Sequence, residues 1–252
     1  QRQMCIETGI VPCCAKLIDF PCNQSCFCSI IEKTVAGEVS MENRYIKLQA
    51  PGCNVPLKVV PGHFATNHSH INYYIDMTTL KTRVSEAQEV ARDLVGLYLY
   101  NTFVDTIVCL DGMDVVGAYL AEELTKAGVM SRNAHQTIYV VTPEYNSNSQ
   151  MIFRDNIQPM ITGKNVILLM ASVTTGKTIN KGVECIQYYG GKLQGISAIF
   201  SAIGELDGMP VNSVFRERDI PDYQTYDFRE CPYCKKGIKL DALVNGYGYS
   251  KI

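Results

Sequence analysis

The sequence predicts an α/β fold in which a mostly parallel sheet is flanked by helices. After residue 84, short apolar runs alternate four times with stretches of helical period. This alternation is typical of parallel strands joined by helices that cover both faces of the sheet. Turns at 111–114 and 172–178 each follow a predicted strand. Because ligands of such sheets bind outside the carboxyl ends of the strands, we expect the functional site at these two turns.

The composition bounds the class of protein. The chain has 252 residues, of which 46% are hydrophobic and 19% charged, as in a globular protein with one large core. Its net charge of −2 gives no electrostatic case for a nucleic-acid or membrane-surface partner. No apolar run approaches the ~20 residues of a membrane helix, and the N-terminus lacks the pattern of a signal peptide. We therefore expect a cytoplasmic protein.

Residues 1–40 differ from the rest of the chain because six of the 11 cysteines lie there and periodicity is weak. One interpretation is a metal or redox knot built on Cys22, Cys26 and Cys28, although their spacing matches no paired zinc knuckle. The other is a poorly ordered extension. A third hypothesis makes Met41 the true start, since residues 37–40 can be encoded by a purine-rich ribosome-binding stretch.

The next segment leads into the predicted strands. Prolines and glycines at 51–62 predict an irregular lead-in, followed by His63, His68 and His70 and by a strand at 71–76. His68 and His70 would share one face of a strand, which allows a metal site. Because the neighbouring sequence offers no fourth ligand, a polar loop or a substrate-facing edge is the interpretation we favour.

The later elements are predicted from their period and from their stop signals. The remaining strands are expected at 106–110, 137–141, 166–170 and 196–202, and the helices at 85–100, 115–127 and 179–189. Residues 143–163 show no clear period. A structureless loop of that length is uncommon inside a domain and is often a mobile lid.

The stretch 165–178, NVILLMASVTTGKT, predicts an anion site. A buried strand, a turn rich in hydroxyls and a helix start bring backbone N–H groups and the positive end of the helix dipole to one spot, where a phosphate is the expected guest. The turn at Asp111 and Gly112 would suit a Mg²⁺-bound phosphate or a sugar hydroxyl. Alternatively, Asp111 and Asp114 only favour the start of a helix.

Two interpretations of the phosphate turn remain open at this point. Ala171 to Thr178 fits a relaxed Walker A pattern, in which Lys177 would contact the β- and γ-phosphates and Thr178 would hold Mg²⁺. That interpretation predicts a nucleotide triphosphatase or kinase. However, only one good strand follows, and it ends near Ala202 without an acidic residue.

The other interpretation is a resemblance. An apolar strand followed by Thr-Thr-Gly-x-Thr at 174–178 resembles the phosphoribosyl diphosphate (PRPP) loop of type I phosphoribosyltransferases, and the orotate enzymes are the most similar. Residues 64–69 and 73–76, the helix at 85–100 and Cys-Pro-x-Cys-Lys at 231–235 are also similar to orotate-type sequences. The resemblance covers about residues 43–240. It implies a small N-terminal hood before the α/β core and a flexible loop before the PRPP strand.

The resemblance also implies a function, namely transfer of a phosphoribosyl group from PRPP to a nucleobase, most simply orotate, in pyrimidine nucleotide synthesis. Pyrophosphate would be released, Mg²⁺ would accompany PRPP, and the protein would be a homodimer. The implied 5′-phosphate site is Ser172, Thr174, Thr175, Gly176, Lys177 and Thr178. The implied pyrophosphate site is Asp111, Gly112 and Met113, the base site is Asn67, Ser69 and Tyr73, and the catalytic cation of the loop is Arg154.

The sequence departs from the family pattern in one important place. Met170 and Ala171 stand where the family has two adjacent carboxylates that engage the ribose hydroxyls. An alternative function is therefore a relative that binds a phosphoribosyl ligand without turnover.

A C-x-x-C pair, Cys231 and Cys234, stands in the segment that we expect to form a C-terminal tail at 226–252, after a domain at 41–225. The pair resembles one zinc knuckle, and a tetrahedral site needs two more ligands. Cys185 or the N-terminal cysteines would have to supply them, so a structural zinc is not the interpretation we favour.

Overall fold

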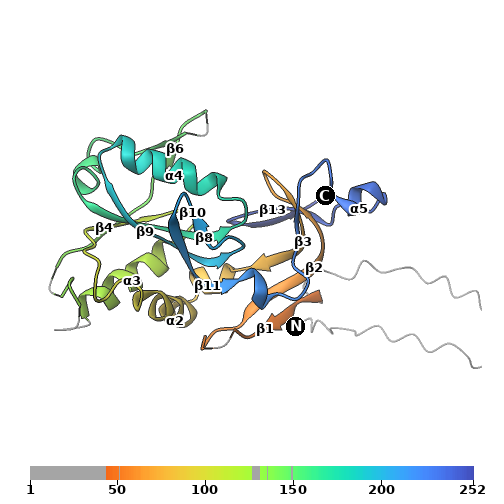
Figure 1. Cartoon of the computed structure of the whole chain (residues 1–252), viewed down its shortest axis with the longest axis horizontal. Coiled ribbons are helices and arrows are strands. Elements are labelled where there is room, and N and C mark those ends of the chain that lie inside the picture. The colour runs from red at the N-terminus through yellow and green to blue at the C-terminus, as the bar shows by residue number, and fades with distance from the viewer. Residues whose placement is uncertain (1–43, 51, 127–130, 135, 149) are drawn as a thin grey trace, which may run out of the picture. The chain divides into compact units, whose positions relative to one another are not determined.

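The computed structural model describes residues 44–50, 52–126, 131–134, 136–148 and 150–252, all within one compact unit, Val39–Ile252 (Figure 1). The predictions for residues 1–40, including the cysteine knot and the start at Met41, fall outside these residues.

The α/β fold is as predicted. A central sheet has the order β10-β11-β9-β8-β4-β5, and every pairing in it is parallel except the hairpin of β10 with β11. Its strands are β4 (Thr106–Cys109), β5 (Tyr139–Val141), β8 (Asn165–Val173), β9 (Lys192–Ser201), β10 (Glu205–Leu206) and β11 (Met209–Arg216). The strands expected at 106–110, 137–141, 166–170 and 196–202 are β4, β5, β8 and β9. Strand β11 was not predicted.

Helices cover both faces of this sheet (Figure 1). Helices α2 (Val84–Val95) and α3 (Asp114–Lys126) pack on one face, and α4 (Lys177–Tyr188) packs on the other. Side chains of β8 alternate between the two cores: Ile167, Leu169 and Ala171 join the α2–α3 side, and their neighbours at 166, 168 and 170 join the α4 side. A strand buried on both faces explains why its sequence is continuously apolar.

A second sheet forms the hood, and it is not made of N-terminal residues alone. Its order is β12-β3-β2-β13-β14, with β1 paired to β2. The strands are β1 (Ile46–Leu48), β2 (Leu57–Ala65), β3 (His70–Asp76), β12 (Thr225–Tyr226), β13 (Ala242–Asn245) and β14 (Gly248–Lys251). The expected tail at 226–252 is therefore not a separate segment, since β13 pairs in parallel with β2 at the middle of this sheet.

Strand β2 lies where an irregular lead-in was predicted. Pro61 and Gly62 interrupt its sequence, and the pairing with β3 shifts register between Pro61 and Phe64. A bulge of this kind tolerates a proline because the ladder is already broken there. A side chain at Gly62 would collide with Asp241 and Phe64, so the glycine allows the chain leading into β13 to approach closely.

The expected structureless lid at 143–163 is also ordered into short elements. Strands β6 (Glu144–Tyr145) and β7 (Met151–Ile152) form a hairpin, and a 3₁₀ turn, η3 (Gln158–Met160), follows. The Asn146 side chain closes the hairpin by accepting the N–H groups of Asn148 and Gln150 at 2.9 and 3.0 Å. Such local side-chain bonds produce no period in the sequence. The remaining short elements are α1 (Thr78–Thr82), η4 (Glu217–Asp219) and α5 (Pro232–Lys235).

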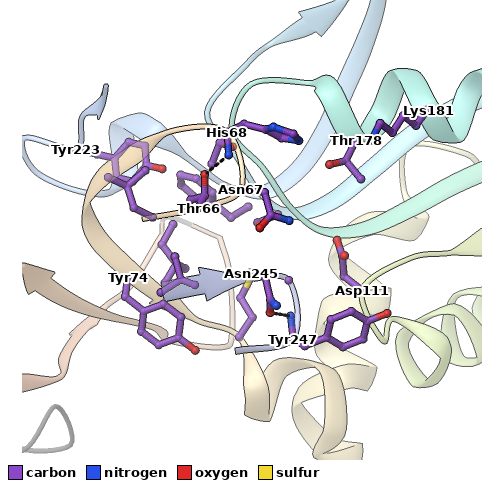
Figure 2. A pocket seen from close by; sticks show the side chains of 18 of the residues that line it. Thr66, Asn67, His68, Tyr74, Asp111, Thr178, Lys181, Tyr223, Asn245 and Tyr247 are labelled. Carbon is purple, nitrogen blue, oxygen red and sulfur yellow. Dashed lines mark hydrogen bonds between the residues drawn. The ribbon is translucent and has the colours of Figure 1, made fainter. Parts of the chain in front are cut away.

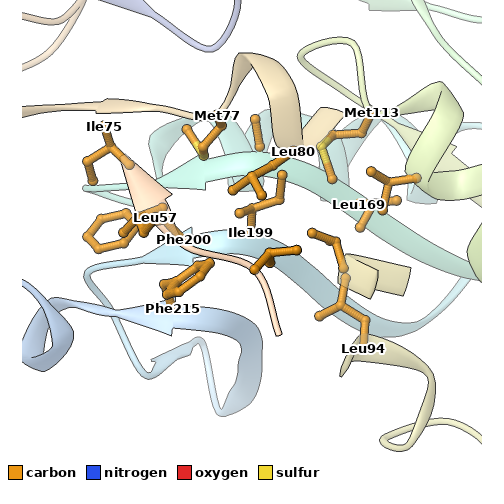
Figure 3. Close-up of a cluster of buried hydrophobic side chains, with 14 of the residues drawn as sticks. Leu57, Ile75, Met77, Leu80, Leu94, Met113, Leu169, Ile199, Phe200 and Phe215 are labelled. Atoms are coloured by element: carbon orange, nitrogen blue, oxygen red, sulfur yellow. The ribbon is translucent and has the colours of Figure 1, made fainter. Parts of the chain in front are cut away.

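The larger core joins the two sheets (Figure 3). Leu57 and Ile75 of the hood sheet lie with Phe200 and Phe215 of the central sheet, and Leu80 of α1 fills the space beside them. This packing fixes the hood against the carboxyl ends of the central strands. Among the described residues, no helix has both the length and the apolar character needed to cross a bilayer.

Gly117 of α3 is predicted to be essential for the packing of that helix on β4. A methyl group there would overlap Cys109 Sγ and lie 3.1 Å from Val140. Overpacking in a core costs ~1–3 kcal/mol. We expect Gly117→Ala to lower the free energy of unfolding by about that amount in chemical denaturation.

Gly96 provides the matched control, because it ends α2 in a helical conformation and a methyl group there meets nothing within 4 Å. Gly96→Ala should be neutral or stabilising by up to ~1 kcal/mol. Equal destabilisation by both substitutions would show that the close contact at Gly117 is not the cause.

Candidate functional site

A cavity of ≈370 Å³ lies where the carboxyl ends of the central strands meet the hood sheet (Figure 2). It is lined by segments that are distant in sequence. These are the turn after β2, strand β3, the turns after β4 and β8, helix α4, the β6–β7 hairpin and the β13–β14 turn. The lining residues are Thr66, Asn67, His68, Ile71, Tyr74, Ile75, Met77, Asp111, Tyr145, Met151, Ser172, Thr174, Thr178, Lys181, Phe200, Tyr223, Val244, Asn245, Gly246 and Tyr247.

One end of the cavity lies at the start of helix α4. Strand β8 ends at Val173, and Gly176, with φ 76°, caps the start of α4 three residues later. The first hydrogen bond of the helix is the one that the Asn180 N–H donates to the Gly176 carbonyl at 3.0 Å. The earlier N–H groups of the helix have no partner within it, and they carry the positive end of its dipole.

Side chains complete this end of the cavity. The Ser172, Thr174 and Thr178 hydroxyl-bearing side chains line it, together with Lys181, which lies three residues after Thr178 on the same helix (Figure 2). Hydroxyls, a lysine and a helix N-terminus form a suitable site for a phosphate.

This arrangement divides the predicted 5′-phosphate residues into two groups. Ser172, Thr174 and Thr178 line the cavity, whereas Thr175, Gly176 and Lys177 are not among its lining side chains. Lys177 and Thr175 are exposed. Sequence reasoning missed Lys181, although its i, i+3 spacing from Thr178 on a predicted helix was a usable signal.

The same turn does not support the Walker A interpretation. Only three residues separate β8 from α4, and Lys177 is exposed and lies outside the cavity lining. Strand β9 ends at Ser201, and the next acidic residue, Glu205, lies in β10. The geometry thus lacks the long phosphate-wrapping loop of that enzyme class.

Asp111 lies on the cavity wall in a strained turn. Its φ is 55° and that of Gly112 is 75°, a conformation that costs a non-glycine residue energy and is found preferentially at functional sites. Burial raises the pKa of the Asp111 carboxyl, while Lys81 and the Ala171 N–H, which donates to the carboxylate, oppose this rise. Of the predicted pyrophosphate residues, Gly112 and the fully buried Met113 do not line the cavity.

Lys81 is a second residue that sequence reasoning missed. It is 6% exposed, and its Nζ donates to the Asp111 carbonyl at 2.9 Å and to the Gly246 carbonyl at 2.5 Å. Burial lowers its pKa. Lys81 thereby joins the turn after β4 to the β13–β14 turn. Gly246 is needed for that approach, because a side chain there would overlap the Asp111 carboxylate.

The other end of the cavity is more aromatic. Tyr74 and Tyr223 lie there in Figure 2, and Asn67 stands between them and the Thr178 end. Of the predicted base-site residues, Asn67 lines the cavity and the other two do not. Ser69 is buried in the β2–β3 turn, where Thr66 Oγ1 lies 2.9 Å from its Oγ. Neighbouring strand residues face opposite sides, which is why Tyr74 lines the cavity in place of Tyr73.

Arg154 is not among the cavity residues. It follows the β6–β7 hairpin, is exposed, and forms an ion pair with Glu144 in which Nη2 lies 2.7 Å from Oε2. The hairpin contributes Tyr145 and Met151 to the lining instead. Met170 and Ala171 lie within β8, 1% and 0% exposed, and face opposite sides of the central sheet.

Of the candidate partners of the C-x-x-C pair, Cys185 does not lie beside it, and the N-terminal cysteines fall outside the described residues. Cys185 lies on α4, where its Sγ contacts the Met151 carbonyl at 3.4 Å. Cys231 and Cys234 instead lie beside His63 and His70, and the ligand atoms of all four are within 4.8 Å of one another.

Comparisons with known proteins agree with the resemblance to type I phosphoribosyltransferases. No family model matches the chain. Over 80 residues the chain is 32% identical to an orotate phosphoribosyltransferase of Caldanaerobacter subterraneus subsp. tengcongensis, a match that covers 31% of this chain and 40% of that relative. The matched segment is thus less than half of the relative's length.

Solved structures were also found. The orotate phosphoribosyltransferase of Mycobacterium tuberculosis is 18% identical with a TM-score of 0.46, and the match covers 65% of this chain and 91% of that one. The UMP synthase of Leishmania donovani is 17% identical with a TM-score of 0.48, over 64% and 34% of the two chains. The adenine phosphoribosyltransferase of Trypanosoma brucei is 14% identical with a TM-score of 0.45, over 72% and 80%.

The position of Lys181 leads to a test of the anion site. Lys181→Ala should weaken binding of ribose 5-phosphate by roughly tenfold or more in a calorimetric titration, because a charged hydrogen bond contributes ~1.5–3 kcal/mol. Lys177→Ala is the control, since that lysine is exposed outside the cavity and should leave the affinity nearly unchanged. A larger loss for Lys177→Ala would instead favour the Walker A interpretation.

Proposed function

We propose that this cavity binds a 5-phosphoribosyl group and that the chain is a phosphoribosyltransferase, which joins a nucleobase to PRPP with release of pyrophosphate. The observation that carries the proposal is the anion site at the start of α4, where Thr174, Thr178 and Lys181 line one end of a cavity whose other end is aromatic. A phosphate at the helix N-terminus would leave the sugar and the base to extend toward Asn67 and the tyrosines.

Orotate is the base that we propose as acceptor. The relative with 32% identity is an orotate phosphoribosyltransferase, and Asn67 offers an amide that can both donate and accept hydrogen bonds to a pyrimidine edge. Tyr74 and Tyr223 add apolar ring surface beside it. The pathway we propose is therefore pyrimidine nucleotide synthesis.

The side chains around the cavity suggest how the protein would support this reaction. Transfer at the sugar C1 carbon has oxocarbenium character, so water has to be kept away. Tyr145 and Met151 of the β6–β7 hairpin line the cavity from the α4 side, and Tyr247 lines it from the hood side. We propose that these side chains exclude water while the start of α4 fixes the phosphate.

The cavity lining offers a protein-bound Mg²⁺ a single carboxylate. Mg²⁺ is usually held by one or two carboxylates together with substrate phosphates and waters. Asp111 is the one carboxylate among the lining residues, and its carboxylate already accepts the Ala171 N–H. In our proposal Mg²⁺ would therefore arrive bound to the pyrophosphate of PRPP, and no step is assigned to it.

A second candidate function is binding of a phosphoribosyl ligand without turnover. The buried Met170 and Ala171 favour it, because the structure offers no carboxylate at either position to engage the ribose hydroxyls. Such a protein would retain the phosphate site but would not lower the barrier to transfer. The homodimer that the resemblance implies stays a prediction for either function.

One calorimetric series tests the phosphoribosyl site that both functions share. We expect PRPP to bind in the presence of Mg²⁺ and ATP not to bind, because the site suits a single 5′-phosphate. Thr178→Val should weaken PRPP binding several-fold by removing a hydroxyl from the cavity wall, whereas the exposed Thr175→Val should not. Binding of ATP without binding of PRPP would contradict both candidates.

Turnover is measured separately, as pyrophosphate release after orotate is added to the PRPP complex. The transferase proposal predicts release that depends on both substrates and falls in Thr178→Val. Tight PRPP binding without release, tested with orotate and with adenine, would leave the binding function as the correct one.

A further inference from the structure

Four side chains from three segments converge on one point outside the cavity. His63 lies on β2, His70 begins β3, and Cys231 and Cys234 lie at the start and within the short helix α5. His63 and Cys231 are buried, at 1% and 0% exposure, whereas Cys234 is exposed, so the cluster is accessible from solvent on one side. The five cysteines of the described residues are all free thiols.

The distances match those around a tetrahedral ion. His63 Nε2 lies 3.1 Å from His70 Nδ1, 3.4 Å from Cys231 Sγ and 3.6 Å from Cys234 Sγ, and Cys234 Sγ lies 3.4 Å from His70 Nδ1. Ligands held tetrahedrally at ~2.0–2.3 Å from zinc are separated from one another by roughly 3.3–3.8 Å. These four of the six separations are close to this range, and the other two are within 4.8 Å.

Hydrogen bonds within the cluster do not account for this arrangement. His63 Nδ1 lies 3.0 Å from the Ile238 carbonyl and 3.3 Å from the Lys239 carbonyl, so Nδ1 carries the proton. The Nε2 atom then has a single lone pair. Three polar atoms face that lone pair, and it can accept a hydrogen bond from only one of them. A cation bound by all four atoms satisfies each of them.

The surroundings of His63 are those of an oriented metal ligand. A metal-binding histidine usually donates its second N–H to a carbonyl or carboxylate, which fixes the ring. Here the ring also stacks on Tyr233, between the two cysteines, with centroids 5.2 Å apart and planes 22° apart. The backbone of His63 is held by Asp241, whose carboxylate accepts its N–H at 2.8 Å and whose N–H donates to its carbonyl at 2.8 Å.

We propose that His63, His70, Cys231 and Cys234 form a structural zinc site. Two imidazoles and two thiolates are the ligand set typical of tetrahedral Zn²⁺, and the two thiolate charges neutralise the ion, so that no net charge is buried. All four positions are taken by protein, which makes the site closed and structural rather than catalytic.

The position of the site indicates what the zinc stabilises. Residues 66–68, on the cavity wall, lie between His63 and His70, and residues 244–247, also on the wall, follow the cysteine segment. Zinc would hold these two segments of the cavity wall in a fixed position relative to each other. The proposal does not depend on the identity of the cavity ligand.

The test is the zinc content of the full chain after removal of any affinity tag, measured by mass spectrometry of metals. Because residues 1–40 contain six further cysteines, the informative quantity is the difference between variants. Cys234→Ser and His70→Asn should each hold one zinc equivalent fewer than the unaltered chain. Cys185→Ser and His68→Asn, which change the same residue types outside the cluster, should hold the same amount as the unaltered chain.

A second measurement covers the case in which a variant folds poorly. A chelator should lower the Tm of the unaltered chain by several degrees, and Zn²⁺ should restore it, because the metal binds only the folded arrangement. Co²⁺ substitution should give the visible absorption of a tetrahedral site with thiolate ligands. Equal zinc content in the unaltered chain and both cluster variants, or a Cys231–Cys234 disulfide in peptide mapping, would overturn the proposal.

Discussion

The position of strand β8 determines where the site can form. This strand is hydrogen-bonded to β4 on one edge and to β9 on the other, and its side chains are buried on both faces. Polar atoms therefore cannot be accommodated along its length, and they collect where the strand leaves the sheet. The short turn that follows leads directly into α4, so the hydroxyls of the turn and the helix N-terminus necessarily face the same space. Met170 and Ala171 belong to the buried part of this strand, so neither side chain lines the cavity at its carboxyl end.

The opposite wall of the cavity depends on contacts between segments distant in sequence. The hood sheet is completed by β13, which pairs with β2. The turn after β13 is joined to the turn at Asp111 by the Lys81 side chain, which donates to a backbone carbonyl of each turn. The two histidines of the cluster lie on this same sheet, in β2 and β3, and the two cysteines lie at α5. Two turns of the cavity wall are thus joined by Lys81, which does not line the cavity itself.

The sequence predicts the elements whose pattern is local. Strands β4 and β8 and helices α3 and α4 have clear apolar periods or continuous apolar runs, and their positions agree with the predictions. Strand β2 could not be predicted, because Pro61 and Gly62 break its pattern and only the bulge beside β3 accommodates them. The site was predicted at the turn after β8 for the same local reasons. The pairing of His63 with Cys231 spans 168 residues, and no local signal indicates which distant ligands will meet.

The pairing of β13 with β2 has a consequence for synthesis of the protein on the ribosome. Strands β2 and β3 are made early, yet the sheet that they belong to lacks an inner neighbour until residues 242–245 have left the exit tunnel. Until then the end of β2 that β13 covers, Phe64 and Ala65, is free to pair with other chains, whereas β1 already pairs with residues 57–59. Contacts between such distant segments form slowly. The nascent chain thus has an exposed strand end until the β13 segment has emerged, and this interval is when we expect it to depend most on chaperones.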